Sequence, residues 1–404
     1  MLLIIRNPKF RLLWFSTIFN DMGLIMYMVV HGWLALEVTD SPFWVGATSG
    51  MGGLGMMAFS IFSGVLADRF DRRKLIIGTH LIEIAMAFVL AFIILSGRIQ
   101  LWEVLVFAFL SGVLISAKIP SKMALTLDVV GRSRLLNATA ANFTAMTMMG
   151  IIAPILSGAV ISAFDIGWAY VIIGVAYLIS AAILANLRGI VRAEKEPSSP
   201  WDDLKEGVRY VFTTPVVRML ILMVLVSEAF GWSHEVMLPV MAREVLNVGA
   251  SGYGYLIAAG SVGGLVSTVI MSSMGEIGNK GRLLIVGLGG YGLFLMLFAS
   301  STSFSLSLVL IAFAYASVII YETTLTTLLQ TVVPDEMRGR VLSFQTFTWG
   351  VTGFSGFHTG AIASAVGAPL SIAIGGGVVL LNALRLTRRV SRLQIPSSEP
   401  AVGD

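Results

Sequence analysis

Residues 64–74 read GVLADRFDRRK, a charged stretch that separates two long apolar segments. Four basic residues follow Asp68 within this stretch, and such a run is expensive to bury in a membrane. It is therefore expected to lie in water, where a hairpin of two membrane helices turns. Because positive charge is retained in the cytoplasm, the stretch predicts a polytopic membrane protein with this loop on the inner face.

The composition of the whole chain also predicts a membrane protein. Of its 404 residues, 56% are hydrophobic and 12% are charged, about half the charge of an average soluble protein. The apolar residues fall in blocks of about 20, which is the length that spans the hydrocarbon core as a helix. We predict an all-α polytopic fold with twelve spans at 10–36, 43–67, 75–96, 101–121, 137–164, 168–187, 216–242, 251–274, 283–300, 304–327, 341–366 and 369–386.

The positions of lysine and arginine predict the orientation. Twelve spans place both termini on one side, and only Arg98 and Arg243 then fall in outer loops. Both termini of this multi-pass protein are therefore expected in the cytoplasm. The pI of about 9.4 reflects the same bias. It predicts no nucleic-acid partner, because no basic face interleaved with aromatic residues occurs in a soluble domain.

Internal similarity predicts two halves. VVGR at 129–132 follows the fourth predicted span and aligns with VVPD at 332–335, which follows the tenth. A duplicated six-helix unit is typical of transporters whose halves are related by an axis along the membrane normal. The predicted domains are an N-terminal six-helix bundle (1–187), a cytoplasmic linker (188–215) with an amphipathic helix at 201–212, a C-terminal six-helix bundle (216–388) and a cytoplasmic tail (389–404).

The charged stretch has the pattern Gly-x-Leu-Ala-Asp-Arg-x-x-Arg-Arg-Lys, which resembles the loop between helices 2 and 3 of the major facilitator superfamily. The resemblance implies the twelve-helix fold of these transporters, with a conformational latch formed by Gly64, Asp68, Arg69 and Arg72. The charge of Asp68 is placed to cap the amino end of the eleventh span, near Arg338. A purely topological role for Arg72 and its basic neighbours is the alternative.

GIIAPILSG at 150–158 resembles the antiporter motif of drug-exporting members of this superfamily. Gly150, Pro154 and Gly158 match the motif, whereas Ala153 and Ser157 replace glycines. Small residues permit close helix approach and a proline bends a helix, which suits a rocking interface. The resemblance implies export, and a packing-only role of Pro154 is the alternative.

LTTLLQTVVPDEMRGRVLS at 325–343, together with LPVMAREVL at 238–246, resembles the branch that holds bacterial siderophore exporters and macrolide-type drug efflux pumps. The resemblance implies a monomer in the cell inner membrane that exports a lipophilic or amphipathic small molecule in exchange for protons. A lysophospholipid or nutrient transporter of the same fold, and a membrane sensor that transports nothing, are the alternatives.

Ionisable residues inside the spans point to the mechanism, because each costs at least about 2.5 kcal/mol at the bilayer centre. Asp21 in the first span and Glu228 in the seventh lie at similar depths, and both are candidates to bind a proton or substrate. Lys118 and Glu322 occupy matching places in the repeat and are expected to pair across the central cavity. Snorkelling of Lys118, or of Lys122, to the inner headgroups is the alternative.

Four further ionisable positions are secondary candidates. Glu83 is expected to face the second or fourth span instead of the cavity. His31, His234 and Glu235 lie toward the outer side, where a proton exit route and plain polar contacts are the two alternatives.

The sequence predicts no enzyme, cofactor or metal site. It has no cysteine, which excludes disulfides, cysteine-zinc sites and thiol catalysis. It also has no phosphate-binding Gly-x-x-x-x-Gly-Lys-Ser/Thr loop, and its histidines lack metal-ligand spacing. Energy is therefore expected from an ion gradient, with a buried carboxylate as the proton carrier.

Overall fold

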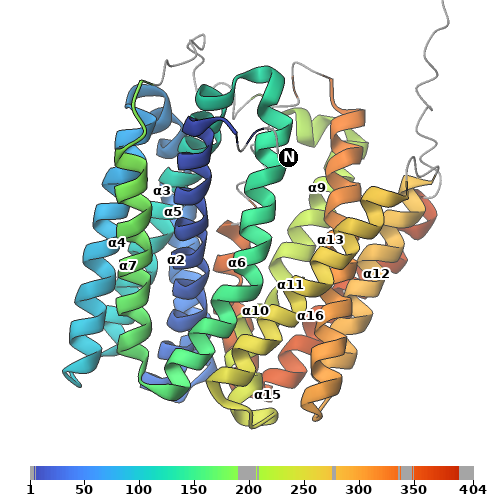
Figure 1. Ribbon diagram of the computed structural model, residues 1–404. Coiled ribbons are helices and arrows are strands. Elements are labelled where there is room, and N and C mark those ends of the chain that lie inside the picture. The colour runs from blue at the N-terminus through green and yellow to red at the C-terminus, as the bar shows by residue number, and fades with distance from the viewer. Residues whose placement is uncertain are drawn as a thin grey trace, which may run out of the picture.

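The computed structural model describes residues 4, 6–189, 206, 209–274, 279–334, 337, 348 and 350–390. Helices dominate, and no strand occurs among the described residues. Figure 1 shows the helices standing side by side, with those from the beginning of the chain on one side of the bundle and those from its end on the other. The predicted all-α class is confirmed.

The first half of the chain contributes the blue to green helices of Figure 1. They are α2 (Pro8–Thr39), α3 (Pro42–Arg69), α4 (Arg72–Leu95), α5 (Leu101–Val130), α6 (Leu135–Ala163) and α7 (Ile166–Ala185), with a short 3-10 turn, η1 (Arg132–Arg134), before α6. We call α2 to α7 the first half.

The second half begins with a composite span that contains two π-helical turns. Its parts are α9 (Pro215–Val226), the turn η2 (Ser227–Gly231), α10 (Ser233–Val240) and the turn η3 (Met241–Val245). Then follow α11 (Gly249–Ser273), α12 (Lys280–Ala299), α13 (Phe304–Val332), α15 (Gly356–Val366) and α16 (Ala368–Val390). Single π turns are frequent at functional sites, and η2 contains Glu228.

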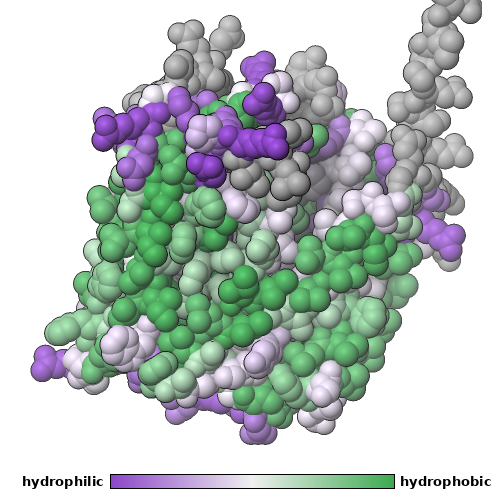
Figure 2. Space-filling view, viewed as in Figure 1, coloured by the Kyte–Doolittle hydropathy of each residue, from purple (hydrophilic) through white to green (hydrophobic). Residues whose placement is uncertain are grey.

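The surface has the layering of a membrane protein. Ten segments of the described chain are long and apolar enough to cross a membrane, and α3 and α15 occupy the places of the second and eleventh predicted spans. Figure 2 shows an apolar middle between hydrophilic ends. Large apolar side chains such as Phe92 are exposed on the helices, where lipid solvates them.

Several helices extend beyond their predicted ends. The fourth and tenth predicted spans end at 121 and 327, whereas α5 continues to Val130 and α13 to Val332. Backbone hydrogen bonding continues where the apolar run stops, because a helix can project into the polar layer. The predicted amphipathic helix at 201–212 lies outside the described residues, apart from Glu206 and 209–212, which are helical.

The charged loop between α3 and α4 ties two helix ends together. The Asp71 side chain accepts a hydrogen bond from the Lys74 N–H at 2.9 Å and so caps the start of α4. Arg73 Nε donates to the Leu184 carbonyl at 2.9 Å, and Arg73 Nη2 donates to the Ala185 carbonyl. A cation at the end of α7 satisfies carbonyls that lack intrahelical partners. The loop thus fixes α4 against α7.

The two halves meet toward one end of the bundle. We call the end at which α2 begins the N-terminal face and the end at which α2 ends the distal face. The halves contact through α3 against α15 and α6 against α11, and α10 touches α2 and α3. The contacting residues of α3 lie in its N-terminal half, and α3 begins at the distal face. The described contacts therefore close the bundle toward its distal face.

Glycines permit the closest of these contacts. A Cβ added to Gly46 would overlap the Gly356 carbonyl and lie 2.7 Å from Gly360 Cα, and a Cβ added to Gly353 would lie 2.7 Å from Gly53 Cα. All these neighbours are backbone atoms, so no side-chain rotation can relieve the overlap. Small residues allow such backbone approach between membrane helices.

The substitution Gly46→Ala is expected to force the halves apart at the distal face. Overpacking of this kind costs about 1–3 kcal/mol, which shifts the closed-to-open equilibrium roughly 5- to 150-fold. The measurement is labelling of a single cysteine, Ser261→Cys, by an impermeant maleimide added from the distal side, since the chain has no cysteine of its own. Labelling should rise in Gly46→Ala.

The matched control for this experiment is Gly78→Ala in α4. A Cβ on Gly78 has no neighbour within 4 Å, so labelling at position 261 should stay at the level of the unsubstituted chain. Equal labelling of the Gly46 and Gly78 variants would show that the glycine contact does not limit opening.

Candidate functional site

Asp21 lies within α2 and forms an ion pair. Lys122 Nζ of α5 donates to Asp21 Oδ1 at 2.8 Å, and Asn20 Nδ2 donates to the same oxygen at 2.7 Å. Asp21 is buried, and its Oδ2 has no partner within the described structure. Lys122, for which snorkelling to the inner headgroups was the alternative, forms an ion pair with this buried carboxylate instead.

Lys118 is paired with Glu83 of α4, not with Glu322. Lys118 Nζ lies 2.6 Å from Glu83 Oε1, and both side chains are buried. The predicted pair of Lys118 and Glu322 is wrong because the repeat equates the depths of two residues but not the directions of their side chains. Glu83 faces the fourth span, as expected.

A hydrogen-bonded chain continues from this ion pair to α7 and α2. His80 Nδ1 lies 2.9 Å from Glu83 Oε2, and His80 Nε2 lies 3.1 Å from Ser180 Oγ. The hydroxyls of Ser180 and Ser16 are 2.9 Å apart. Helices α2, α4, α5 and α7 are thus joined by polar contacts inside the first half.

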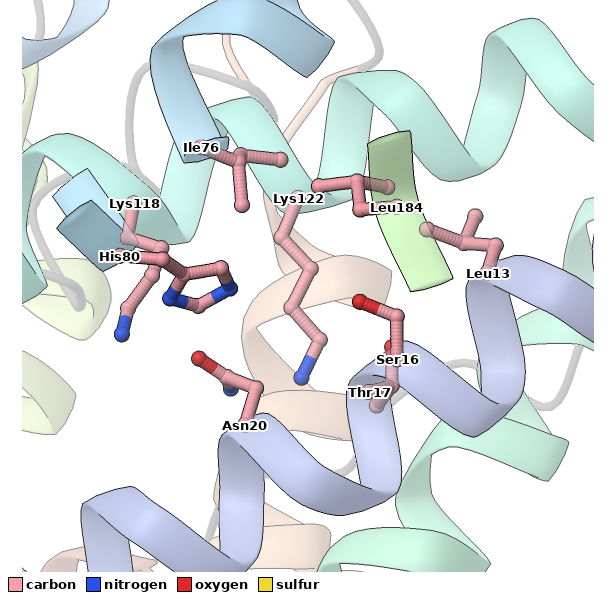
Figure 3. Close-up of a pocket in the computed structure, with 9 residues that line it drawn as sticks. All are labelled: Leu13, Ser16, Thr17, Asn20, Ile76, His80, Lys118, Lys122 and Leu184. Atoms are coloured by element: carbon pink, nitrogen blue, oxygen red, sulfur yellow. The ribbon is translucent and has the colours of Figure 1, made fainter. Parts of the chain in front are cut away.

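Figure 3 shows these groups around a small cavity, with the Lys122 side chain reaching toward Asn20 and Ser16. The cavity is lined by Leu13, Ser16, Thr17, Asn20, Ile76, His80, Lys118, Lys122 and Leu184. Each lysine here binds an acid, so the cluster carries no net charge when both ion pairs are formed. Sequence reasoning missed His80, although its spacing of three residues from Glu83 places both on one helix face.

Arg72 makes an ion pair within the first half. Arg72 Nη1 lies 2.6 Å from Asp128 Oδ2 of α5, and both side chains are buried. The surroundings of Gly64, Asp68 and Arg69, and Arg338, lie outside the described residues. The latch between the halves therefore remains a prediction.

The second half contains three acids in a different environment. Glu228 of η2 is 6% exposed and accepts a hydrogen bond from the Thr352 hydroxyl. Glu235 of α10 is exposed and accepts one from Tyr315 Oη at 3.3 Å. Glu322 of α13 is half-buried and lies two turns after Tyr315 on the same helix. Within the described residues none of these three glutamates has a cationic partner.

The motif residues of the fifth span lie at the contact between the halves. Ser261 Oγ of α11 donates to the Gly150 carbonyl at 2.8 Å, and Ser251 Oγ donates to the Gly158 carbonyl at 3.3 Å. A Cβ on Gly254 of α11 would lie 3.0 Å from the Pro154 carbonyl carbon. The motif therefore occupies the α6–α11 interface, where its proposed rocking role and its packing role would both act.

An ion pair bridges the halves at the distal face. Arg243 Nη2 of η3 lies 2.6 Å from Asp40 Oδ1, and Arg243 Nη1 donates to the Leu36 carbonyl at 3.3 Å. Asp40 is 82% exposed, and exposed pairs contribute only about 0–1 kcal/mol. The glycine contacts between α3 and α15 therefore dominate the closure of this face.

The sequence is similar to known proteins over nearly its whole length. Residues 2–401 match the family described as transmembrane secretion effector. The enterobactin exporter EntS of Escherichia fergusonii is 23% identical over 407 residues, covering 98% of this chain and 95% of that protein. The enterobactin exporter EntS of Shigella boydii serotype 18 shows the same identity and coverage.

The fold is similar to that of solved transporter structures. A bacterial homologue of the human lysosomal transporter Spinster, inward-facing and unoccupied, has a TM-score of 0.75 at 16% identity, covering 96% of this chain and 97% of that one. The POT family transporter PepTSo has a TM-score of 0.74 at 12% identity, covering 95% and 99%. The family match spans nearly the whole chain and the helices have the arrangement of transporters, so the chain belongs to the transmembrane secretion effector family of major facilitator transporters and is not an enzyme.

Proposed function

We propose that the protein is a secondary active transporter that exports a lipophilic or amphipathic small molecule in exchange for protons. The observation that carries this proposal is Glu228, a buried carboxylate in a π-helical turn with a hydroxyl partner and no cation within the described structure. Burial without a counter-charge favours binding of a proton by a carboxylate. Intramembrane acids of this kind mark proton pathways.

Asp21 is the second candidate for the proton carrier. A proton on Asp21 has to compete with Lys122, which already lies 2.8 Å from its carboxylate. Glu228 can take up a proton without breaking an ion pair, so we assign the coupled proton to Glu228 first. Lys118 has Glu83 as its partner and is assigned to holding α5 against α4 instead of to substrate binding.

Alternating access is supported by the way the halves meet. They contact through small residues toward the distal face, and a contact made by bare backbones can separate without breaking ion pairs in the interior. We infer that the N-terminal face, which carries Arg73 and Lys74 at the start of α4, is cytoplasmic. The described conformation would then be closed to the outside.

The direction of transport and the location rest on the relatives. The similar proteins are named as exporters of enterobactin, and the resemblance of 150–158 to the antiporter motif supports export. We propose a monomer in the cell inner membrane with both termini in the cytoplasm. A siderophore-like or drug-like small molecule is the proposed cargo.

The test is transport of a panel of lipophilic dyes by the purified chain in liposomes across an imposed pH gradient. We expect dye movement against its own gradient, a proton flux in the opposite direction, and loss of both when a protonophore is added. Liposomes without protein, and liposomes with a membrane potential but no pH gradient, are the controls. A rate of dye transport that is unchanged by the protonophore would rule out proton coupling.

A further inference from the structure

We propose that the second half contains a binding site for an organic ammonium group of the cargo, formed by Glu235 and Glu322 together with an aromatic cluster. This inference rests on the proposed transport function and specifies the class of its cargo. The aromatic cluster consists of Trp232, His234, Tyr291 and Tyr315.

The two halves differ in how their acids are compensated. In the first half, Asp21 and Glu83 each bind a lysine. In the second half, Glu228, Glu235 and Glu322 have no ion-pair partner among the described residues. Tyr315, which donates to Glu235, lies two turns before Glu322 on α13. The ionised acids of this group attract positive charge. An anionic ligand would be repelled by the same groups.

The aromatic cluster lies beside these acids. The Trp232 ring centroid is 5.8 Å from that of His234 and 5.9 Å from that of Tyr315, and the Tyr315 hydroxyl donates to Glu235 Oε1 at 3.3 Å. Aromatic faces attract organic cations, with a contribution of about 0.5–2 kcal/mol per desolvated contact. A carboxylate at the edge of an aromatic cluster therefore suits an ammonium group that carries carbon substituents.

Unpartnered polar atoms point to the same place. The Tyr291 hydroxyl and His234 Nε2 are fully buried and have no hydrogen-bond partner in the described structure. Leaving a buried polar group without a partner costs about 1–3 kcal/mol. A polar ligand in this region would satisfy such groups.

The acids are placed where cargo can reach them. Glu235 is exposed, and Glu322 and Trp232 are half-buried. Helix α10, which carries Glu235, contacts α2 and α3 of the first half. The site therefore lies next to a contact between the halves, which alternating access would separate.

A metal cation fits the site less well than an ammonium group. Among the described residues no group of three or more His, Cys, Asp or Glu is arranged to hold a metal ion. The cluster instead offers aromatic rings beside Glu235, and this combination suits a large, weakly hydrated cation.

The test compares two molecules of the same shape and different charge, benzyltrimethylammonium and neopentylbenzene. Binding to the full-length chain in lipid nanodiscs is measured by calorimetry without any ion gradient, with empty nanodiscs as the blank. We expect the cation to bind at least about tenfold more tightly than its uncharged isostere. Phenylacetate, which is anionic, should not bind measurably. Equal affinities for the cation and the isostere would overturn the proposal.

Two variants locate the site, and a third serves as the matched control. Glu235→Gln and Glu322→Gln should each weaken binding of the cation by about tenfold and leave binding of the isostere unchanged. Glu103→Gln at the start of α5 should change neither, because glutamine can also accept the Gln100 N–H that Glu103 now accepts at 2.8 Å. If both variants still prefer the cation over the isostere as strongly as the unsubstituted chain does, Glu235 and Glu322 do not form the site. If a variant fails to fold, the comparison of the two probes on the unsubstituted chain still shows whether the protein prefers the cation.

Failure of this inference is separable from failure of the proposed function. A chain that moves neutral dyes against a gradient but shows no preference for the cation retains proton-coupled export and loses the ammonium site. A chain that prefers the cation but shows no gradient-driven movement retains the site and loses proton coupling.

Discussion

The substitution Glu83→Leu is expected to lower the free energy of unfolding by about 3–5 kcal/mol, because it leaves Lys118 as a buried charge without its partner. His80 would lose its acceptor at the same time, since its Nδ1 lies 2.9 Å from Glu83 Oε2. The double variant Glu83→Leu with Lys118→Met should recover most of this loss, because two apolar side chains then replace the pair. The measurement is the midpoint of thermal unfolding in detergent.

An exposed acid supplies the control for this prediction. Glu37 is 57% exposed at the end of α2, so Glu37→Leu should change the stability by no more than about 0.5 kcal/mol. Additive losses in the double variant would show that Lys118 and Glu83 do not act as a pair. Recovery of stability in the double variant would also exclude Glu322 as the partner of Lys118.

The substitution Glu228→Gln is expected to reduce uphill, proton-driven export to background while the chain remains folded and abundant. Glutamine can still accept the Thr352 hydroxyl hydrogen bond that Glu228 accepts now, but it cannot carry a proton. Movement of cargo down its own gradient should persist, because that step needs no coupled proton. Transport in liposomes with and without a pH gradient separates the two activities.

The comparison with Asp21→Asn decides between the two candidate proton carriers. If Asp21 carried the proton, Asp21→Asn would lose uphill export and Glu228→Gln would keep it. Because Asp21→Asn also frees Lys122 from its ion pair, the double variant Asp21→Asn with Lys122→Gln is needed to remove the effect of an unpaired lysine. Undiminished uphill export by Glu228→Gln would return the assignment to Asp21.

Much of the fold could be predicted from the sequence, because the bilayer acts on each segment separately. An apolar run of sufficient length is helical in lipid whatever it packs against, and ten of the predicted spans appear as described helices of suitable length and hydropathy. The local role of Asp71 as a helix cap is likewise set within one turn of chain. The ends of α5 and α13 were harder to predict, since a helix does not stop where its apolar run stops.

The partners of the charged residues could not be predicted in the same way. Several acids lie at a depth that Lys118 can reach, and the repeat singled out Glu322 because it compares positions along the helices. The packing of α4 against α5 brings Glu83 to within 2.6 Å of Lys118 instead. The rotation of each helix about its axis decides such contacts, and it depends on the neighbouring helices together.

By itself, the sequence determined that this chain is a helical membrane protein and that certain acids lie within its spans, because hydrophobicity and the cost of burying charge act on each segment alone. Only the tertiary structure decided which acids are compensated. Asp21 and Glu83 meet lysines of α5, whereas no lysine or arginine of the described chain reaches Glu228, Glu235 or Glu322. The physical reason is that an ion pair needs two side chains from different helices to point at each other, which only the packing of the helices can arrange.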